Sequence, residues 1–290
     1  MRLEQSVTDF MAAPRTLFAA FDAHGVGYCH WKSNQHLEAA LRGETDLDVL
    51  VARADATNVQ TVLAACGFKR FDSVVGMGYP AIEDYFAFDD VTARLAHCHL
   101  HYRLVVGEHR LKGITLPWEE HFLRTRVWDT DAQLYVADPH LELVTLLTRA
   151  AVKLQWREQL RHALGAGRPD FGMRAEYDWL LARVDRCRLK ELCSALLGES
   201  AAAALADLLE RGLEPRALRR FRSAAWPRIV RFRTYGVLES RARQTMRQAA
   251  WVAAGVSRRY LPVARSLRRT LPAGRSPGDD AGFRLPSTIA

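Results

Sequence analysis

Hydrophobic positions in the first 136 residues alternate between helical and strand spacing. Leu17, Phe18 and Phe21 recur at helical spacing after Pro14, which suits the first turn of a helix, and Gly25 closes the segment. Further elements expected are helices at 36–42 and 57–65 and strands at 26–31, 46–51, 85–88 and 94–102, the last two joined by the turn Asp89-Asp90. The pattern predicts an α/β (α+β) domain with a mixed sheet and flanking helices over residues 1–136.

Beyond residue 136 the hydrophobic spacing becomes helical. Asp138 and Pro139 form an N-cap and first-turn pair for an amphipathic helix that ends near residue 165. Helical runs follow at 173–184, 188–197, 200–211, 215–223 and 238–269. We expect a helical domain packed on the first domain at 137–211 and an arginine-rich helical extension at 212–271. Residues 272–290 are rich in Pro, Gly and Ser without periodicity, which predicts a disordered tail.

The net charge of +8 is unevenly distributed along the chain. Residues 1–210 contain 23 Lys and Arg against 29 Asp and Glu, whereas residues 211–290 contain 18 Arg, no Lys and 4 acids. Arginines mixed with aromatic residues can cover a solvated helical face, contact an anionic membrane surface, or bind nucleic acid. The sequence favours the first two readings over nucleic acid, because no known recognition motif accompanies the charge.

Several protein classes are excluded by composition. No apolar stretch approaches the roughly 20 residues of a transmembrane helix. The first 15 residues contain an early acid and no apolar core, which is unlike a signal peptide. Five cysteines without a Cys-x-x-Cys pair argue against a disulfide framework and a thiolate zinc site. We expect a cytoplasmic protein whose contact with the inner membrane face, if formed, uses the basic C-terminal region.

The segment 30–51 contains the most specific chemistry. A strand ends at Trp31 and a helix begins after Ser33 or Asn34, where free amides and the helix dipole can receive a phosphate. Asp46 and Asp48 are two residues apart at a strand start, so both carboxylates share one face of the sheet. Such a pair can chelate the Mg²⁺ of a nucleoside triphosphate. The alternative is a pair of solvated acids, since an isolated Asp-x-Asp is common.

A row of histidines accompanies the two acids. His97, His99 and His101 alternate along the strand expected at 94–102 and therefore share one face. Beside two aspartates they can bind Mn²⁺ or Zn²⁺, or one of them can act as a base. The alternative is a half-buried ladder hydrogen-bonded to the sheet surface. Cations around this strand can hold phosphate groups or can be solvated; they are Arg94, Arg103, Arg110 and Lys112.

The order and spacing of these elements resemble a known superfamily. A strand, a serine turn, a short helix and Gly43-x-Thr45-Asp46-x-Asp48 before apolar residues resemble the polymerase-β-like nucleotidyltransferases. The segments HWKSN, GETDLDVLV, CHLHYRLVVGEHRLKG and LPWEEHFL are similar to the nucleotidyltransferase-like domain of bacterial surface-polysaccharide clusters. That domain often precedes a thymidylate-kinase-like domain, and no P-loop motif occurs in this sequence. The resemblance covers residues 15–270 and is strongest over 26–120.

The resemblance implies residue roles, with two departures from the family pattern. Lys32-Ser33-Asn34 replaces the usual Gly-Ser turn, so Lys32 is expected to supply charge to the phosphate. The third carboxylate is missing from its strand, where His99 aligns with it. The expected catalytic and metal-binding residues are Asp46, Asp48 and His99, and the expected nucleotide-binding residues are Lys32, Ser33, Asn34 and Arg103. We also expect both acids to lie at a rim, with the His99 ring facing them from the adjacent strand.

The function implied is transfer of a nucleoside monophosphate from a nucleoside triphosphate, dependent on Mg²⁺ or Mn²⁺. The acceptor would be a hydroxyl or phosphate of a small glycan or sugar phosphate in surface-polysaccharide biosynthesis, with pyrophosphate leaving. The alternative is a non-catalytic nucleotide- or sugar-phosphate-binding module that serves as a partner or membrane-surface adaptor. The missing third carboxylate supports this second reading.

Overall fold

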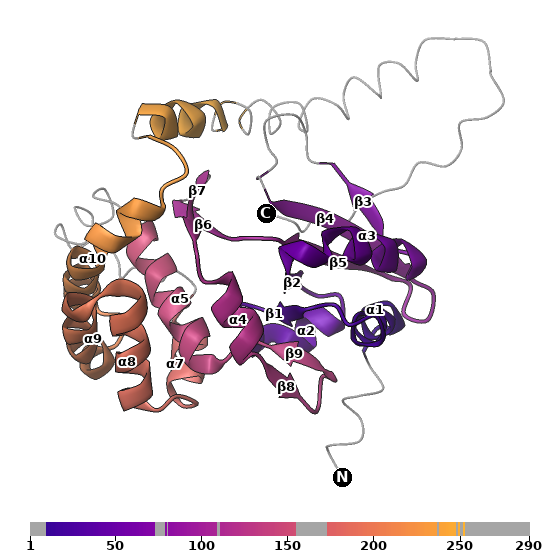
Figure 1. Cartoon of the computed structure of the whole chain (residues 1–290), viewed down its shortest axis with the longest axis horizontal. Coiled ribbons are helices and arrows are strands. Elements are labelled where there is room, and N and C mark those ends of the chain that lie inside the picture. Colours follow the sequence, from indigo (N-terminus) through magenta and orange to yellow (C-terminus); the bar gives the residue numbers. More distant parts are fainter. Residues whose placement is uncertain are drawn as a thin grey trace, which may run out of the picture. The chain divides into compact units, whose positions relative to one another are not determined.

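The computed structural model describes residues 10–72, 79, 81–108, 111–154, 173–236, 238–247, 249 and 252. The chain divides into two compact units, residues 1–244 and 245–290. Every named helix and strand belongs to the first unit (Figure 1). The predicted tail at 272–290 and most of the extension beyond residue 247 lie outside the described residues.

A mixed seven-stranded sheet forms the centre of the α/β part (Figure 1). Its strands, in spatial order, are β3 (Lys69–Phe71), β4 (Ile82–Asp89), β5 (Arg94–His101), β2 (Leu47–Val51), β1 (Tyr28–His30), β9 (Leu134–Val136) and β8 (Val127–Asp129). The pairs β2–β5 and β1–β9 are parallel, and the other neighbours are antiparallel. The expected mixed α/β sheet is therefore confirmed, and the expected hairpin of β4 and β5 is longer than its sequence pattern indicates.

Two hydrophobic cores lie on opposite faces of this sheet because side chains alternate along each strand. On one face Leu47, Val49 and Val51 pack in a core with α1 (Ala12–Ala23) and α3 (Ala56–Ala65). Short helical segments connect these elements; they are η2 (Asn34–His36), α2 (Leu37–Leu41) and η3 (Arg53–Asp55). Because a core covers each face of the sheet, all residues of β2 are buried.

The second core joins the other face of the sheet to the helical region. It contains Trp31 and Leu50 together with side chains of α4 (Glu119–Thr125) and α5 (Pro139–Lys153). Asp138 caps α5 by accepting a hydrogen bond from the His140 amide, as the sequence predicts. A separate hairpin of β6 (Leu104–Glu108) and β7 (Leu111–Leu116), which the hydrophobic pattern does not predict, contacts α5 through β6.

The remaining helices extend the second core. They are α7 (Arg174–Leu181), α8 (Arg186–Leu197), α9 (Glu199–Arg211) and α10 (Pro215–Ile229), followed by η4 (Val230–Phe232). Helix α10 packs on α5 and α9 and buries Leu218 and Phe221. Residues 215–229, which the sequence predicts as the start of an arginine-rich helical extension, form a helix that packs on the other helices.

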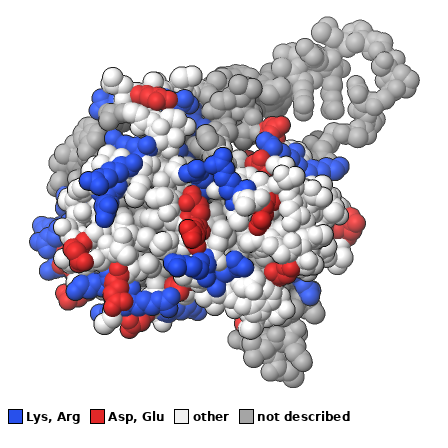
Figure 2. Space-filling model, in the orientation of Figure 1, with Lys and Arg blue, Asp and Glu red and all other residues white. Residues whose placement is uncertain are grey.

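The arginines at the start of the basic region have partners within the protein. Arg211 and Arg220 both pair with Asp207, and the Trp226 ring has the Arg222 guanidinium 4.3 Å from its centroid. On the face drawn in Figure 2, basic and acidic side chains are interspersed. No helix within the described residues is both long and apolar enough to cross a bilayer. Membrane-surface contact by the basic region stays a prediction, and Trp251 lies outside the described residues.

Two glycines with left-handed backbone conformations allow a test of the packing before β2. Gly43 and Gly67 both have positive φ, but a Cβ on Gly43 would lie 2.5 Å from the buried Met11 sulfur, whereas one on Gly67 would meet nothing within 4 Å. Gly67→Ala should lower the free energy of unfolding by about 1 to 2 kcal/mol through backbone strain alone. Gly43→Ala should cost about 1 to 3 kcal/mol more because of overpacking. Urea denaturation of both variants measures the difference, and equal losses would contradict the packing at Gly43.

Candidate functional site

The structure brings the predicted acids and histidines together on one face of the sheet. Strands β2 and β5 are parallel neighbours with Asp48 opposite His99. The Nδ1 atom of His97 lies 2.7 Å from Asp46 Oδ1, and Nε2 of His101 lies 3.2 Å from Asp48 Oδ1. The Nδ1 atom of His99 lies 3.8 Å from Asp46 and 3.6 Å from Asp48. The expectation that His99 faces both acids from the adjacent strand is confirmed.

A third carboxylate, absent from the sequence prediction, comes from β4. Asp84 is paired with His99 across the β4–β5 ladder. Its Oδ1 atom lies 3.0 Å from Nε2 of His99 and 3.4 Å from Nε2 of His97. The antiparallel neighbour of the histidine strand thus adds a carboxylate to the cluster. Counting the register of the hairpin would have identified Asp84, but the sequence does not fix the length of its loop.

Aromatic neighbours hold the histidine rings in place. The Phe86 ring stacks on His97 with centroids 4.1 Å apart and planes 8° apart. The Trp31 ring meets the fully buried His101 edge to face at 5.2 Å. His97 and His99 are perpendicular at 4.3 Å. Because packing restricts these rings, their nitrogen atoms are presented in a defined arrangement before any ligand binds.

His99 and His101 titrate differently because their surroundings differ. Burial lowers the pKa of His99, but its hydrogen bonds to Asp48 and Asp84 outweigh burial and raise that pKa to about 9. Burial dominates at His101 and lowers its pKa to about 4 despite the bond to Asp48. At neutral pH His99 is therefore protonated and His101 neutral. The His99 imidazolium acts as an internal counter-ion among three carboxylates.

Lys32 lies next to this cluster, but it contacts a carboxylate. Its Nζ atom is 2.7 Å from Asp48 Oδ2. The Asp48 side chain is only 10% exposed, whereas that of Asp46 is 37% exposed. The expectation that both acids lie at a rim is therefore right for Asp46 and wrong for Asp48. Charge attraction to Lys32 draws Asp48 inward, because a buried carboxylate needs a paired cation.

The turn expected to bind phosphate is also occupied by carboxylates of the protein. Ser33 precedes η2 with a left-handed φ of 59° and makes no side-chain cap bond. Its amide donates to Glu176 Oε1 at 3.2 Å, and the Asn34 amide donates to Glu142 Oε1 at 3.0 Å. The Asn34 side chain also donates to Glu142 Oε2 at 2.6 Å. A phosphate at this turn would have to displace both carboxylates.

Three further cations were candidates for phosphate binding. Lys112 on β7 is half-buried, with Nζ 4.8 Å from the centroid of the Tyr79 ring. Burial, followed by repulsion from Lys32, lowers its pKa to about 8, and Asp48 and Asp84 act on it as well. Lys112 therefore belongs electrostatically to the acid–histidine cluster. Arg94 instead donates to the Arg42 carbonyl, and Arg110 lies outside the described residues.

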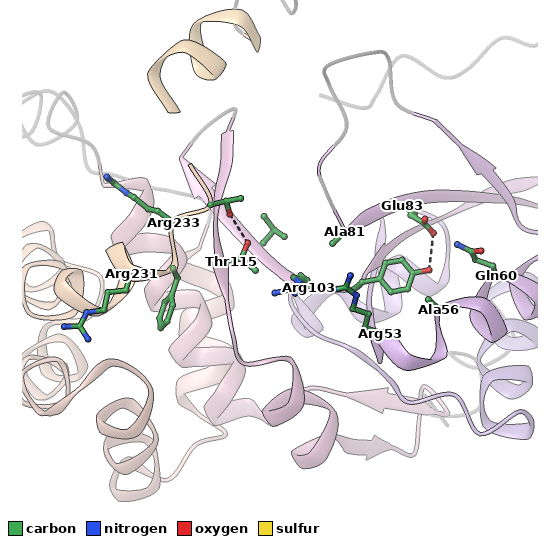
Figure 3. Close-up of a pocket in the computed structure, with 13 residues that line it drawn as sticks. Arg53, Ala56, Gln60, Ala81, Glu83, Arg103, Thr115, Arg231 and Arg233 are labelled. Carbon is green, nitrogen blue, oxygen red and sulfur yellow. Dashed lines mark hydrogen bonds between the residues drawn. The ribbon is translucent and has the colours of Figure 1, made fainter. Parts of the chain in front are cut away.

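Arg103 lines a cavity outside the acid–histidine cluster. This cavity of about 750 Å³ is also lined by Arg53 and Glu83, and none of the acids and histidines of the cluster contributes to that lining. Figure 3 shows Arg53 and Arg103 on one side of this cavity, with the guanidinium groups of Arg231 and Arg233 directed away from it. The structure thus joins Lys32 to Asp48, bonds Ser33 and Asn34 to Glu176 and Glu142, and places Arg103 in a separate cavity.

The buried Glu142 allows a test of the turn. Burial raises its pKa to about 7, against the opposing effect of the Asn34 bonds and with a further increase from Glu176; Arg149 also acts on it and lowers it. The unfolded carboxyl has a pKa of about 4.3. The folded state thus holds a proton that the unfolded state has lost between these pH values, so stability should fall as pH rises from about 4.3 to 7, by about 2 to 4 kcal/mol.

Glu142→Gln should remove this component, because the amide does not titrate. Denaturant unfolding at a series of pH values would measure the slopes. Glu120→Gln, at an exposed position, is the matched control and should retain the slope of the unsubstituted chain. A slope in Glu142→Gln equal to that of the control would show that Glu142 titrates alike in both states.

The cluster contains donors that suit a divalent cation. Asp46, His97 and His99 form one group and Asp48, His99 and His101 another, with the donor atoms of each group within 4.8 Å of one another. Carboxylate oxygen and imidazole nitrogen both bind divalent metals. No protein-family model matches the chain, and no curated protein or solved structure matches it significantly. The chemistry of the site is therefore argued from its own geometry.

Proposed function

We propose that the chain is a metal-dependent nucleotidyltransferase that acts on a small glycan or sugar-phosphate acceptor in surface-polysaccharide biosynthesis. The observation that carries the proposal is the convergence of Asp46, Asp48 and Asp84 on His99. Each of the three carboxylates has an oxygen within 3.8 Å of a nitrogen of that ring. Asp46 and Asp48 face the Nδ1 atom and Asp84 the Nε2 atom, so Asp46 and Asp48 form the carboxylate pair that can hold a divalent cation on a triphosphate.

In the proposed reaction an acceptor oxygen attacks the α-phosphorus of a nucleoside triphosphate. The bond from that phosphorus to the bridging oxygen breaks, and pyrophosphate leaves with the oxygen. Mg²⁺ or Mn²⁺, when bound, stabilises the charge that develops on the phosphate oxygens. Asp46 and Asp48 hold the cation, and Lys32 and Lys112 offer positive charge to the triphosphate.

With the cation on Asp46 and Asp48 alone, His99 would carry no metal, and it is proposed to accept the proton that an acceptor hydroxyl loses. It must be neutral to do so, whereas the nearby carboxylates raise its pKa to about 9. A cation on those carboxylates would remove much of the attraction that favours the imidazolium. Cation binding and base function are thereby linked.

A second candidate is a non-catalytic nucleotide- or sugar-phosphate-binding module. The ion pair of Lys32 with Asp48 and the carboxylates on the Ser33 and Asn34 amides favour it, because groups expected to bind ligand are bonded within the protein. A module of this kind binds its ligand without releasing pyrophosphate. An assay of pyrophosphate release therefore distinguishes it from an enzyme.

Asp46→Asn tests the proposal without disturbing the buried Lys32–Asp48 pair. The unsubstituted chain should bind a nucleoside triphosphate in Mg²⁺ or Mn²⁺ and lose that affinity when the metal is chelated. The variant should bind at least tenfold more weakly, because the exposed carboxylate is the accessible metal ligand. Calorimetric titration with each of the four common triphosphates measures the affinities.

Asp131→Asn, at an exposed acid of the β8–β9 turn, is the control and should bind as the unsubstituted chain does. Pyrophosphate release with sugar phosphates as acceptors then separates the candidates: release supports the transferase, and tight binding without release supports the module. Equal metal-dependent nucleotide affinity in Asp46→Asn and Asp131→Asn would contradict both the transferase and the binding module.

A further inference from the structure

We propose that Asp46, His97 and His99 form a binding site for a divalent transition metal, Zn²⁺ or Mn²⁺, in preference to Mg²⁺, and that Asp84 orients both imidazoles through their Nε2 atoms. These four residues are called the outer group, and Asp48, His99 and His101 the inner group. The proposal deepens the proposed function, on which it rests for the role of this face, by naming the metal class. It adds Asp84, from a strand that the sequence motif does not include.

The distances within the outer group are close to those of a metal site. The donor atoms of Asp46, His97 and His99 lie within 4.8 Å of one another. Asp84 Oδ1 is 3.0 Å from His99 and 3.4 Å from His97. In a tetrahedral site with bonds of about 2.0 to 2.1 Å, neighbouring donors are about 3.3 Å apart. The Nδ1 atoms of His97 and His99 face Asp46 and their Nε2 atoms face Asp84, so an ion at the Nδ1 side would leave Asp84 as the hydrogen-bond partner of both ligating rings.

Charge distinguishes the outer group from the inner one. The Asp48 carboxylate of the inner group is neutralised by Lys32 at 2.7 Å. Within the described part of the chain, Asp46 forms ion pairs only with His97 and His99. With neutral imidazoles, the two carboxylates of the outer group carry two negative charges. A divalent cation at Asp46 would replace the proton of His99 and would not have to displace a lysine from that carboxylate.

Access and rigidity also favour the outer group. The side chains of Asp46 and Asp84 are 37% and 27% exposed, so an ion can enter from solvent, whereas His101 is fully buried. The stacked Phe86 ring fixes the orientation of His97. Rigid support of a ligating imidazole raises metal affinity because little conformational freedom is lost on binding.

The donor set determines which metal is preferred. Two imidazole nitrogens with one carboxylate suit Zn²⁺ and Mn²⁺, since imidazole is a common ligand of transition metals. Mg²⁺ favours an octahedral shell of oxygen atoms and keeps several of its waters. A site in which two of the three protein donors are nitrogen atoms therefore selects against Mg²⁺.

Calorimetric titration of the full chain with ZnCl₂, MnCl₂ and MgCl₂, without nucleotide, tests the proposal. One Zn²⁺ should bind per chain at least 100-fold more tightly than Mg²⁺. His97→Gln and Asp84→Asn should each weaken Zn²⁺ binding at least tenfold. Asp90→Asn, at an exposed acid in the turn of the same hairpin, should leave it unchanged.

Electron paramagnetic resonance of the Mn²⁺ complex identifies the ligands directly. Pulsed spectra of the unsubstituted chain should show coupling to imidazole nitrogen, and that coupling should decrease in His97→Gln. Thermal unfolding of the metal-free variants checks that they are folded. Should Asp84→Asn fail to fold, His97→Gln alone decides.

Absence of nitrogen coupling, or equal Zn²⁺ affinity in His97→Gln and Asp90→Asn, would overturn the outer site. Failure of nucleotidyl transfer is a separate outcome, because these titrations contain no nucleotide. Magnesium-dependent nucleotide binding without a zinc site would overturn this inference and leave the proposed function standing.

Discussion

The parallel pairing of β2 with β5 is the interaction on which the candidate site depends. It aligns Asp48 with His99, and the alternation of side chains then decides which residues face the cluster. A slip of one residue would turn the acids toward the apolar face. Leu47 and Val49 on β2 and Leu100 on β5 are fully buried on that face. Hydrophobic packing on one side of the sheet thus fixes the position of the polar cluster on the other.

A second set of buried polar contacts connects the helical layer to the motif. Glu142 on α5 receives the backbone and side-chain hydrogen bonds of Asn34, and the Asn34 side-chain oxygen lies 2.6 Å from His30 Nδ1. Buried polar groups are costly unless they are bonded, so these contacts hold the turn in a single arrangement. Glu176 on α7 bonds the Ser33 amide in the same way. The geometry of the turn therefore depends on helices more than 100 residues away in sequence.

Hydrophobic spacing was sufficient to predict the mixed α/β class, the helix at Asp138–Pro139 and the shared face of Asp46 and Asp48. These features follow from local periodicity and capping, which are properties of short segments. Asp84 could not be predicted because its position opposite His99 depends on the loop length of the hairpin, where Ala93 adopts a positive φ. The hydrogen bonds of the turn to Glu142 and Glu176 could not be predicted either, because they arise from tertiary packing of helices on the turn. Strands as short as Leu134–Val136 contain too few residues to show a period.

The negative charge of the cluster is partly neutralised by its own side chains, and these internal pairs constrain what a ligand can do. Lys32 neutralises Asp48, and the His99 imidazolium compensates the neighbouring carboxylates. A cation bound among these acids would weaken both attractions, because it supplies the same charge at shorter range. Lys32 would then be available to a phosphate, and His99 would lose its proton more easily. A metal and a phosphorylated ligand would therefore each favour binding of the other, since each pairs with a charge that the other releases.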